Sequence, residues 1–461
     1  MVGAIGGGLC QLSNALYDCA LQADCEILER HAHSRIVPGS AAARGRDATV
    51  AWNYVDLRFS AARDLRMTAR VAQDQLVVRL YGAQAERQLS PPPVSPDSAG
   101  QAPHGPRSCA TCDETDCHLH QRERRTRSAD APVHAFLVDE AWPEFAAYVE
   151  AIRGPNDRLG RPIDGARLGL RRYAWPGAGF ERVQSAPMAA ISRTLALRSA
   201  GASAVRLRRA ELAGAERLAQ ALASLLAYDV TGVTVAQSYL PYLWRDGLLG
   251  ARDLSVLMTR LPLAEMQTRL DAAAARHPNR RTLSEFRAPA WLVEAEADAL
   301  AACARIITPH TEVAAYFGDR AVRLPWSSPL LPSRAQGDLT GRILFPGPTV
   351  GRKGADQVRE AALALDLEVF AVGSPLEGED FWRPARTVRL TDWRQVDAVV
   401  QPAVIEHQPR GLLAALAIGL PVIATPACGL APQPGLTLVP PGDTAALIAA
   451  LSDVLAGARQ G

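Results

Sequence analysis

Lysine is almost absent from this chain of 461 residues. Of its 50 basic residues, 49 are arginine, and the single lysine is Lys353. A position that keeps lysine where arginine is used everywhere else indicates a need for a compact ammonium on a flexible stem. Lys353 follows an apolar strand (343–345) and a Gly/Pro-rich loop, and a helix is expected from about Ala355. Because backbone N–H groups at a helix start favour anions, the position indicates phosphate binding; the alternative is a solvated lysine in a turn.

The chain also lacks a strong net charge, a signal peptide and a clean transmembrane run. Its net charge of +2 argues against nucleic acid as a partner. Residues 1–8 have neither the basic start nor the apolar core of a signal peptide. The uncharged stretch between Arg410 and Asp443 is interrupted by Pro421 and Pro426, which predicts helix, turn and buried strand rather than a transmembrane segment. We expect a cytoplasmic protein, with peripheral membrane contact as a further option.

Cysteine is sparse and unevenly spaced, and the eight cysteines do not form a disulfide framework, which favours a reducing compartment. One patch concentrates three thiols and two imidazoles within residues 109–120. A tetrahedral zinc site with three sulfur ligands and one nitrogen ligand is the favoured interpretation, an iron–sulfur cluster is a second, and free thiols in a linker are the alternative. The expected ligands of this structural zinc are Cys109, Cys112, Cys117 and His120, with His118 beside them.

The chain divides by composition into four segments. Residues 1–88 form one block, and residues 89–130 read as a Pro-rich linker that carries the Cys/His patch. The rest alternates apolar strands with amphipathic helices, which predicts two doubly wound parallel-sheet domains, 131–330 and 331–461, with a boundary near residues 325–332. Strands are expected at residues 204–207, 233–236, 254–258, 305–307, 322–324, 342–345, 368–372, 388–390, 398–400, 422–424 and 437–439. Helices are expected at residues 211–227, 263–276, 291–304, 356–364, 411–418 and 444–455.

Three spaced elements characterise the C-terminal segment. They are the strand, loop and Lys353-Gly354; Glu406 followed by a helix and the run Gly-Leu-Pro-Val-Ile-Ala-Thr (419–425); and Pro-Pro-Gly-Asp (440–443) before a last helix. Together they resemble the donor-binding domain of GT-B glycosyltransferases, in particular the large retaining family 4. The resemblance is good over roughly 120 residues, and upstream segments fit the N-terminal half of such an enzyme in pattern only.

The resemblance implies a retaining hexosyltransferase that binds a nucleotide-sugar donor and requires no cofactor for catalysis. Lys353 would hold the diphosphate, Glu406 would bind donor hydroxyls near the reacting carbon, and helix-start amides would face the phosphates, since the charge of a leaving diphosphate needs fixed cations and dipoles. Lys353 and Glu406 are the expected catalytic residues. The expected donor-binding residues are Gly347, Arg352, Lys353, Gly354, Glu406, Arg410, Gly411 and Leu412.

Two positions depart from the family pattern. Pro348 stands where the family has a loop arginine, and Ala414 stands where it has a second glutamate that grips the nucleotide ribose. Arg352 and Arg410 could supply the missing cation, but nothing obvious replaces the carboxylate. The alternative function is therefore a non-catalytic, envelope-associated protein with a degenerate glycosyltransferase unit.

The N-terminal block carries a triple glycine before Cys10 and further motifs at residues 29–34, 45–50 and 53–59. These resemble the VanW family, which is linked to the cell envelope, and the match covers about residues 5–80 as a partial α+β domain. It implies a glycan or lipid-linked envelope acceptor for the whole chain. The candidate site of this block is Cys10, His33, Asp47 and Asp56, with His31 as an alternative, and would act by a cysteine nucleophile. The simpler interpretation is that Cys10 is a small buried residue.

Overall fold

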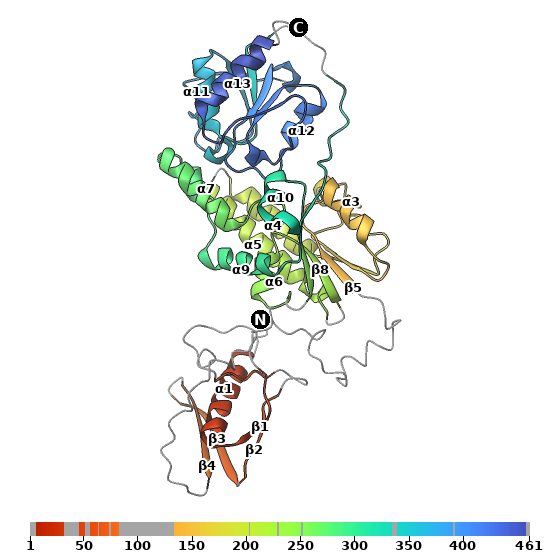
Figure 1. Ribbon diagram of the computed structural model, residues 1–461, viewed down its shortest axis with the longest axis vertical. Coiled ribbons are helices and arrows are strands. Elements are labelled where there is room, and N and C mark those ends of the chain that lie inside the picture. Colours follow the sequence, from red (N-terminus) through yellow and green to blue (C-terminus); the bar gives the residue numbers. More distant parts are fainter. Residues whose placement is uncertain are drawn as a thin grey trace. The chain divides into compact units, whose positions relative to one another are not determined.

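The computed structural model divides into two units (Figure 1). One covers residues 1–131 and 249–251, and the other covers residues 132–248 and 252–461. The structure describes residues 6–31, 46–50, 56–62, 64–72, 75–82, 133–201, 203–227, 230–249, 252–333, 339–390 and 392–457.

The first unit is a small α+β arrangement. Its described elements are α1 (Gly6–Gln22), β1 (Glu26–Glu29), β2 (Arg58–Ser60), β3 (Leu65–Ala72) and β4 (Gln75–Gly82). β1 pairs with β2 and β3 pairs with β4, both antiparallel. The Cys19 thiol on α1 donates to the Val78 carbonyl of β4 at 3.9 Å, so the helix lies against this hairpin.

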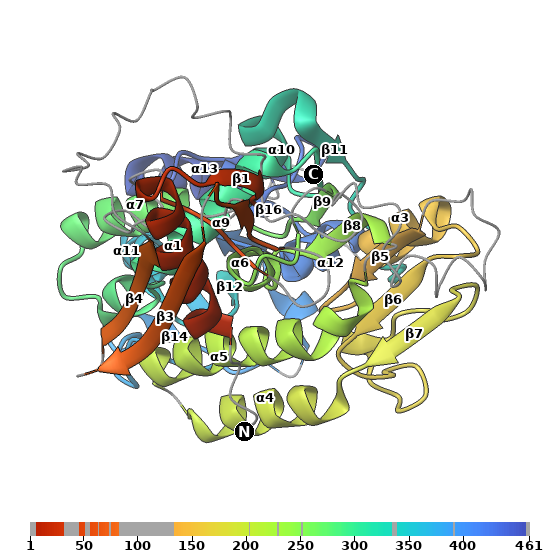
Figure 2. The ribbon, with the colours of Figure 1, turned by 90° about the horizontal axis from the view of Figure 1, so that it is seen from below.

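The second unit begins with a seven-stranded parallel sheet, whose strands β5 to β9 can be followed in Figure 2. Its strands are β5 (Val133–Leu137), β6 (Arg158–Arg161), β7 (Arg182–Ser185), β8 (Val230–Ala236), β9 (Asp253–Leu257), β10 (Arg305–Thr308) and β11 (Ala321–Arg323). Its helices are α3 (Pro143–Ile152), α4 (Pro187–Ser199), α5 (Ala204–Leu222), α6 (Leu240–Arg245), α7 (Leu263–Arg276), α8 (Arg281–Glu285), α9 (Ala290–Ala302) and α10 (Thr311–Phe317). We call this part the N-half.

A six-stranded parallel sheet follows, which we call the C-half. Its strands are β12 (Arg342–Pro346), β13 (Glu368–Val372), β14 (Arg386–Thr387), β15 (Ala398–Gln401), β16 (Val422–Ala424) and β17 (Leu436–Leu438). Its helices are α11 (Ala355–Ala364), α12 (Arg410–Ala417) and α13 (Thr444–Gly457).

Both sheets reverse their strand order at one point. The N-half order is β11-β10-β9-β8-β5-β6-β7, and the C-half order is β14-β13-β12-β15-β16-β17. The chain therefore winds outward in both directions from β5 and β8 in one sheet, and from β12 and β15 in the other. Ligands of doubly wound sheets bind beyond the carboxyl ends of the strands at such a switch point. These sheets confirm the predicted fold class, a pair of doubly wound parallel-sheet domains.

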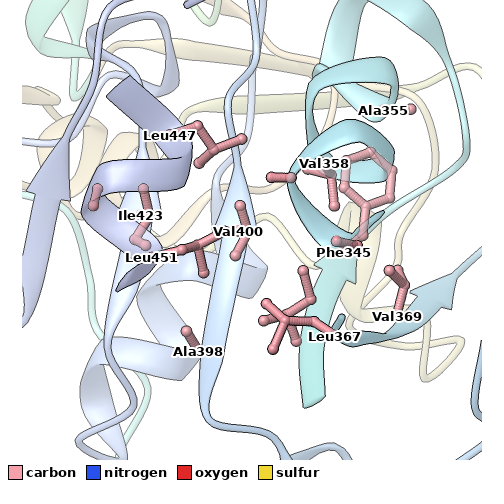
Figure 3. Close-up of a cluster of buried hydrophobic side chains, with 14 of the residues drawn as sticks. Phe345, Ala355, Val358, Leu367, Val369, Ala398, Val400, Ile423, Leu447 and Leu451 are labelled. Atoms are coloured by element: carbon pink, nitrogen blue, oxygen red, sulfur yellow. The ribbon is translucent and has the colours of Figure 1, made fainter. Parts of the chain in front are cut away.

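Strand periodicity explains how the C-half buries both faces of its sheet. Alternate residues of β12 point to opposite faces. Ile343 and Phe345 pack with α11 and α13, as Figure 3 shows for Phe345, whereas Leu344 packs with α12 on the other face. All three side chains are buried, and each contributes about 1.5–3 kcal/mol to folding relative to an exposed side chain.

In the described part of the second unit, two strand predictions are wrong, and three strands were missed. Residues 204–207 begin α5, because the Ser203 hydroxyl accepts from the Arg206 amide at 3.4 Å and caps the helix start. The strand predicted at 388–390 is β14, two residues earlier. The missed strands β5, β6 and β7 are only four or five residues long.

The uncharged stretch between Arg410 and Asp443 folds as helix, turn and strand, as its prolines predicted. α12 ends before Gly419, which has a φ of +82°, and the buried strand β16 follows. Among the helices in the described part of the chain, none has both the length and the apolar character that crossing a membrane requires.

Candidate functional site

The loop after β12 is built around the side chain of Lys353. Gly347 has a φ of +157°, and a Cβ there would lie 2.9 Å from the Lys353 Nζ, so the lysine passes over bare glycine backbone. A 3-10 turn (Gly351–Lys353) then leads to Gly354, which has a φ of +80°. A Cβ at Gly354 would lie 2.3 Å from the Pro402 carbonyl oxygen. Glycine is therefore required at Gly354 both by conformation and by the close approach of the segment after β15.

Lys353 and Glu406, the two expected catalytic residues, form an ion pair. The Lys353 Nζ lies 2.7 Å from the Glu406 Oε2, and their side chains are 12% and 5% exposed. Gln401 also donates to Oε2. The second oxygen, Oε1, accepts from the amides of His407 at 2.9 Å and Gln408 at 3.1 Å. Both carboxylate oxygens are therefore satisfied at the switch point between β12 and β15.

The electrostatics of Glu406 reflect two opposing effects. Burial raises the pKa of its carboxyl, but the positive charges of Lys353 and Arg352 and the lysine hydrogen bond outweigh burial and hold that pKa at about 2. Glu406 is therefore a carboxylate at any physiological pH, suited to accept hydrogen bonds from hydroxyl groups.

The start of α12 faces the same switch point. A Cβ at Gly411 would lie 3.0 Å from the Pro346 Cβ, so the first turn of α12 approaches the end of β12. The amides of Gly411 and Leu412 belong to this first turn, where no preceding helical turn supplies acceptors. They are the kind of donors that bind phosphate oxygens.

Arg410 is engaged elsewhere. Its guanidinium makes a bidentate ion pair with Glu144 of α3, at 2.8 and 2.7 Å, and lies 5.4 and 5.3 Å from the ring centroids of Trp142 and Trp326. Glu144 also accepts from the Ser327 amide at 2.7 Å. Burial raises the pKa of Glu144, but the Arg410 and Ser327 bonds lower it overall. Arg410 thus joins the two halves, and its predicted role with phosphate would require this pair to open.

His310, at the start of α10, has a capping and packing role. It is 1% exposed, its Nδ1 accepts from the Val313 amide at 3.4 Å, and its Nε2 lies 3.1 Å from the Glu406 carbonyl oxygen. Burial lowers the pKa of its imidazole. A neutral His310 Nε2–H can donate to that carbonyl, which fixes the backbone of Glu406 from the N-half.

The two departures from the family pattern lie at this site. Pro348 is packed against Gly373, where a Cβ would lie 2.9 Å from the proline nitrogen. Ala414 lies half-buried in the middle of α12. Neither residue supplies a side-chain charge.

A cavity of about 330 Å³ is lined by chain neighbours of Lys353 and Glu406 and was not predicted from the sequence. It covers the ends of β5, β8 and β9, and Arg352, His407 and Gln408 line it from the C-half. The sequence did contain part of the pattern that indicates such a site. The polar residues Asp139, Ser238 and Arg260 each follow one of these strands by two or three residues. Without β5, however, the switch point of the N-half could not be located.

The candidate residues of the first unit are only partly described. Asp47 is 3% exposed, and its neighbour Ala48 is held to α1, because the Ala48 amide donates to the Asn14 side chain at 2.7 Å. Asp56 is exposed and accepts from the Leu57 amide at 2.9 Å. Cys10 lies within α1, whose first residues include the glycine run. His33, the side chain of Cys10 and the predicted zinc ligands Cys109, Cys112, Cys117 and His120 lie outside the described residues.

Comparison with protein families assigns the two ends of the chain. Residues 343–457 match the family described as "Glycosyl transferases group 1", and residues 1–81 match the family described as "VanW like protein". The chain therefore carries a segment similar to group 1 glycosyl transferases at its C-terminal end and a VanW-like block at its N-terminal end. Among curated proteins it is similar to the uncharacterized protein YoaR of Bacillus subtilis (strain 168), with 33% identity over 81 residues. That match covers 17% of this chain and 26% of the relative's length, about a quarter.

The solved structures to which the chain is similar are distant in sequence. Sucrose-phosphate synthase (tll1590) from Thermosynechococcus elongatus is 16% identical, with 71% of this chain and 90% of that chain covered and a TM-score of 0.44. Anabaena Alr3699/HepE, solved in complex with UDP and glucose, is 14% identical, with 72% and 95% covered and a TM-score of 0.38.

Proposed function

We propose that the second unit is a retaining glycosyltransferase that moves a hexosyl group from a nucleotide-sugar to an acceptor related to the cell envelope. One observation carries the proposal: the Lys353–Glu406 pair, 2.7 Å apart, lies at the switch point of the C-half sheet beside the start of α12. An ammonium, a carboxylate and free helix-start amides in one place match a sugar attached to a diphosphate.

The proposed reaction replaces the diphosphate on the anomeric carbon by the acceptor oxygen. The bond between the anomeric carbon and the diphosphate oxygen breaks, and its electron pair leaves with the nucleoside diphosphate. The acceptor hydroxyl oxygen bonds to the same carbon, and its proton passes to the leaving diphosphate. Lys353 and the amides of Gly411 and Leu412 would stabilise the developing phosphate charge, while Glu406 would hold hydroxyls of the donor sugar.

The alternative is a non-catalytic binding protein, and specific observations favour it. Arg410 is held by Glu144 and Lys353 by Glu406, so two of the three candidate phosphate cations, all but Arg352, already have buried carboxylate partners. Pro348 and Ala414 add no replacement charge. Donor binding would then depend on Lys353 exchanging its carboxylate partner for a phosphate.

Calorimetric titration of nucleoside diphosphates and nucleotide-sugars into the full chain separates these two functions. We expect one diphosphate ligand to bind wild type and to bind Lys353→Ala at least about tenfold more weakly, as loss of a charge-assisted contact requires. Arg383→Ala is the matched control, because Arg383 is an 80% exposed cation of the C-half. A folded wild type that binds no member of the panel would leave only the non-catalytic function.

The envelope acceptor is supported by the match of residues 1–81 to the VanW-like family. Such an acceptor would come within reach if the chain contacted a membrane surface.

Contact with a membrane surface is supported by the exposed face of α4. Met188, Ile191 and Leu195 are 78%, 47% and 59% exposed along one stripe of this helix, and the exposed Arg198 continues the stripe. Apolar and basic residues together suit anionic lipids. Sedimentation with phosphatidylglycerol vesicles should fall on changing the three apolar residues to serine, and unchanged sedimentation would contradict this.

A further inference from the structure

The cavity of the N-half has two ends of different charge balance. At the first end the Asp139 carboxylate accepts two bonds from Arg193, at 2.7 and 3.0 Å, and one from the Ser238 hydroxyl at 3.0 Å. Glu140 pairs with Arg172 in the same place. Two arginines thus face two carboxylates, with Arg193 also 3.8 Å from Glu140, so the end is polar and electrically balanced.

The second end, formed by Arg208, Arg260 and Arg352, has excess positive charge. Arg208 pairs with the half-exposed Glu211 at 3.2 Å and donates to the Arg287 carbonyl at 3.2 Å. Arg260 pairs with the buried Glu296 at 2.9 Å. The Arg352 guanidinium lies 5.6 Å from the Phe286 ring centroid and donates to the Ile405 carbonyl at 3.3 Å. No carboxylate in the described part of the chain is within ion-pair distance of Arg352.

Two of the three guanidiniums, Arg208 and Arg260, are close enough to affect one another. Burial, and then the positive charge of Arg260, lowers the pKa of Arg208. Like charges gathered in a partly buried cavity are unfavourable without a counterion. The arrangement is one that an anion would stabilise.

His407 supplies a second, independent indication of a ligand. It lines the cavity, and its Nε2 is buried with no hydrogen-bond partner. Burial lowers the pKa of its ring well below the usual value, Arg352, Arg260 and His310 lower it further, and Glu406 opposes them. The ring is therefore neutral, and an unsatisfied buried nitrogen costs free energy that a ligand atom would recover.

We propose that this arginine end binds the anionic group of the acceptor, a phosphate or a carboxylate carried on a single sugar ring. The ring's hydroxyls would face Asp139 and Ser238, and His407 Nε2 would bond the ligand between the two ends. A volume of about 330 Å³ lies at the lower limit of ligand cavities, which suits a monosaccharide. Lys353 and Glu406 are not among the cavity-lining residues, but the expected donor-binding residue Arg352 is, so the anion site borders the donor diphosphate site without containing the Lys353–Glu406 pair. That the ligand is the acceptor rests on the proposed function, whereas the presence of an anion site does not.

The test uses three sugars that share one ring: glucose 6-phosphate, glucuronate and glucose. Each is titrated into the full chain, and UDP is titrated separately. We expect one of the anionic sugars to bind at least about tenfold more tightly than glucose, because charge-assisted arginine bonds are stronger than neutral ones. Which of the two binds distinguishes a phosphate from a carboxylate.

Three variants of α5 locate the site. Arg208→Gln should weaken the anionic sugar about tenfold, Arg208→Lys should restore part of the binding, and Arg206→Gln is the matched control. Arg206 is an exposed cation of the same helix and is not among the cavity-lining residues. Circular dichroism reports whether each variant is folded.

Each outcome decides the proposal. Equal binding of the three sugars, binding of none, or equal loss in Arg206→Gln would overturn it, whatever UDP does. Should Arg208→Gln not fold, the order of the three sugars on wild type still decides. Binding of an anionic sugar without any binding of nucleotide would keep the anion site and defeat the proposed function instead.

Discussion

The glycosyltransferase-like unit holds its cations in two different ways. At the switch point of the C-half, Lys353 pairs with Glu406, and Arg410 pairs across to Glu144. Around the cavity of the N-half, the carboxylate partner of Arg208 is half-exposed, and Arg352, which reaches the cavity from the C-half, has a carbonyl and an aromatic ring as neighbours. A paired cation stabilises the fold and must exchange its partner to bind a ligand. A weakly paired cation contributes little to the fold and is ready for a ligand.

The largest expected effect comes from breaking the Lys353–Glu406 pair. Lys353→Met should destabilise the chain by roughly 3–5 kcal/mol, because Glu406 would be left buried and charged. The double variant Lys353→Met with Glu406→Gln should recover much of that loss. Urea unfolding followed by circular dichroism measures both. Equal stability of the single variant and wild type would show that Lys353 is as weakly held as Arg208 and Arg352.

Acid should weaken the same pair. The pKa of Glu406 is about 2 in the folded chain, below the ordinary carboxyl value of 4.5. The stabilisation is therefore complete above about pH 4.5 and is lost as pH falls from there toward 2, up to roughly 3 kcal/mol in all. Urea midpoints across this range for wild type and the double variant measure it. The expected difference between the two shrinks on acidification, and a constant difference would contradict the assignment.

The Arg410–Glu144 pair should matter less. Arg410 is 31% exposed, so water can solvate it when its partner is lost. Glu144→Gln keeps an acceptor for the Ser327 amide, and we expect a loss of roughly 1–2 kcal/mol. Arg305→Gln, at an ion pair whose two side chains are about half exposed, is the control and should change stability by less than about 0.5 kcal/mol. A loss as large as that of Lys353→Met would remove the distinction between the two pairs.

The smallest effect is expected at Arg208. Because burial and Arg260 lower the pKa of this arginine, its charged form is disfavoured in the folded chain. Arg208→Gln should therefore change the free energy of unfolding by less than about 1 kcal/mol in either direction, although it removes a bond to Glu211. A loss of several kcal/mol in urea unfolding would mean that Arg208 is a structural cation. The distinction between paired and weakly paired cations would then fail.

Local patterns were enough to predict most of the C-half. Apolar runs of three to five residues between helical patterns located β12, β13, β15 and β16, because strands buried on both faces are uniformly apolar. The strands of the N-half were harder to predict from local patterns. β6 reads Arg-Leu-Gly-Arg, with both arginines buried, and no apolar run marks it. Strand pairing and arginine contacts, such as Arg161 to the Trp175 carbonyl at 2.8 Å, decide that segment.

The candidate site divides in the same way. The single lysine and the spacing of Glu406 within the motif predicted two residues that the fold does bring to 2.7 Å. The carboxylate that holds Arg410 is 266 residues away and carries no local signal. Neither does the convergence of Arg208, Arg260 and Arg352, which come from three separate segments.

The sequence by itself determined the alternation of strands and helices, the glycines that let Lys353 approach the backbone, and the identity of the two charged residues at the C-half switch point. These depend on short-range sterics and on periodicity, which a local stretch of chain contains. Only the tertiary structure decided which cation has a partner. That outcome depends on distances between residues far apart in the chain and on how much water their packing leaves, and it separates the paired Arg410 from Arg208 and Arg352 in the cavity.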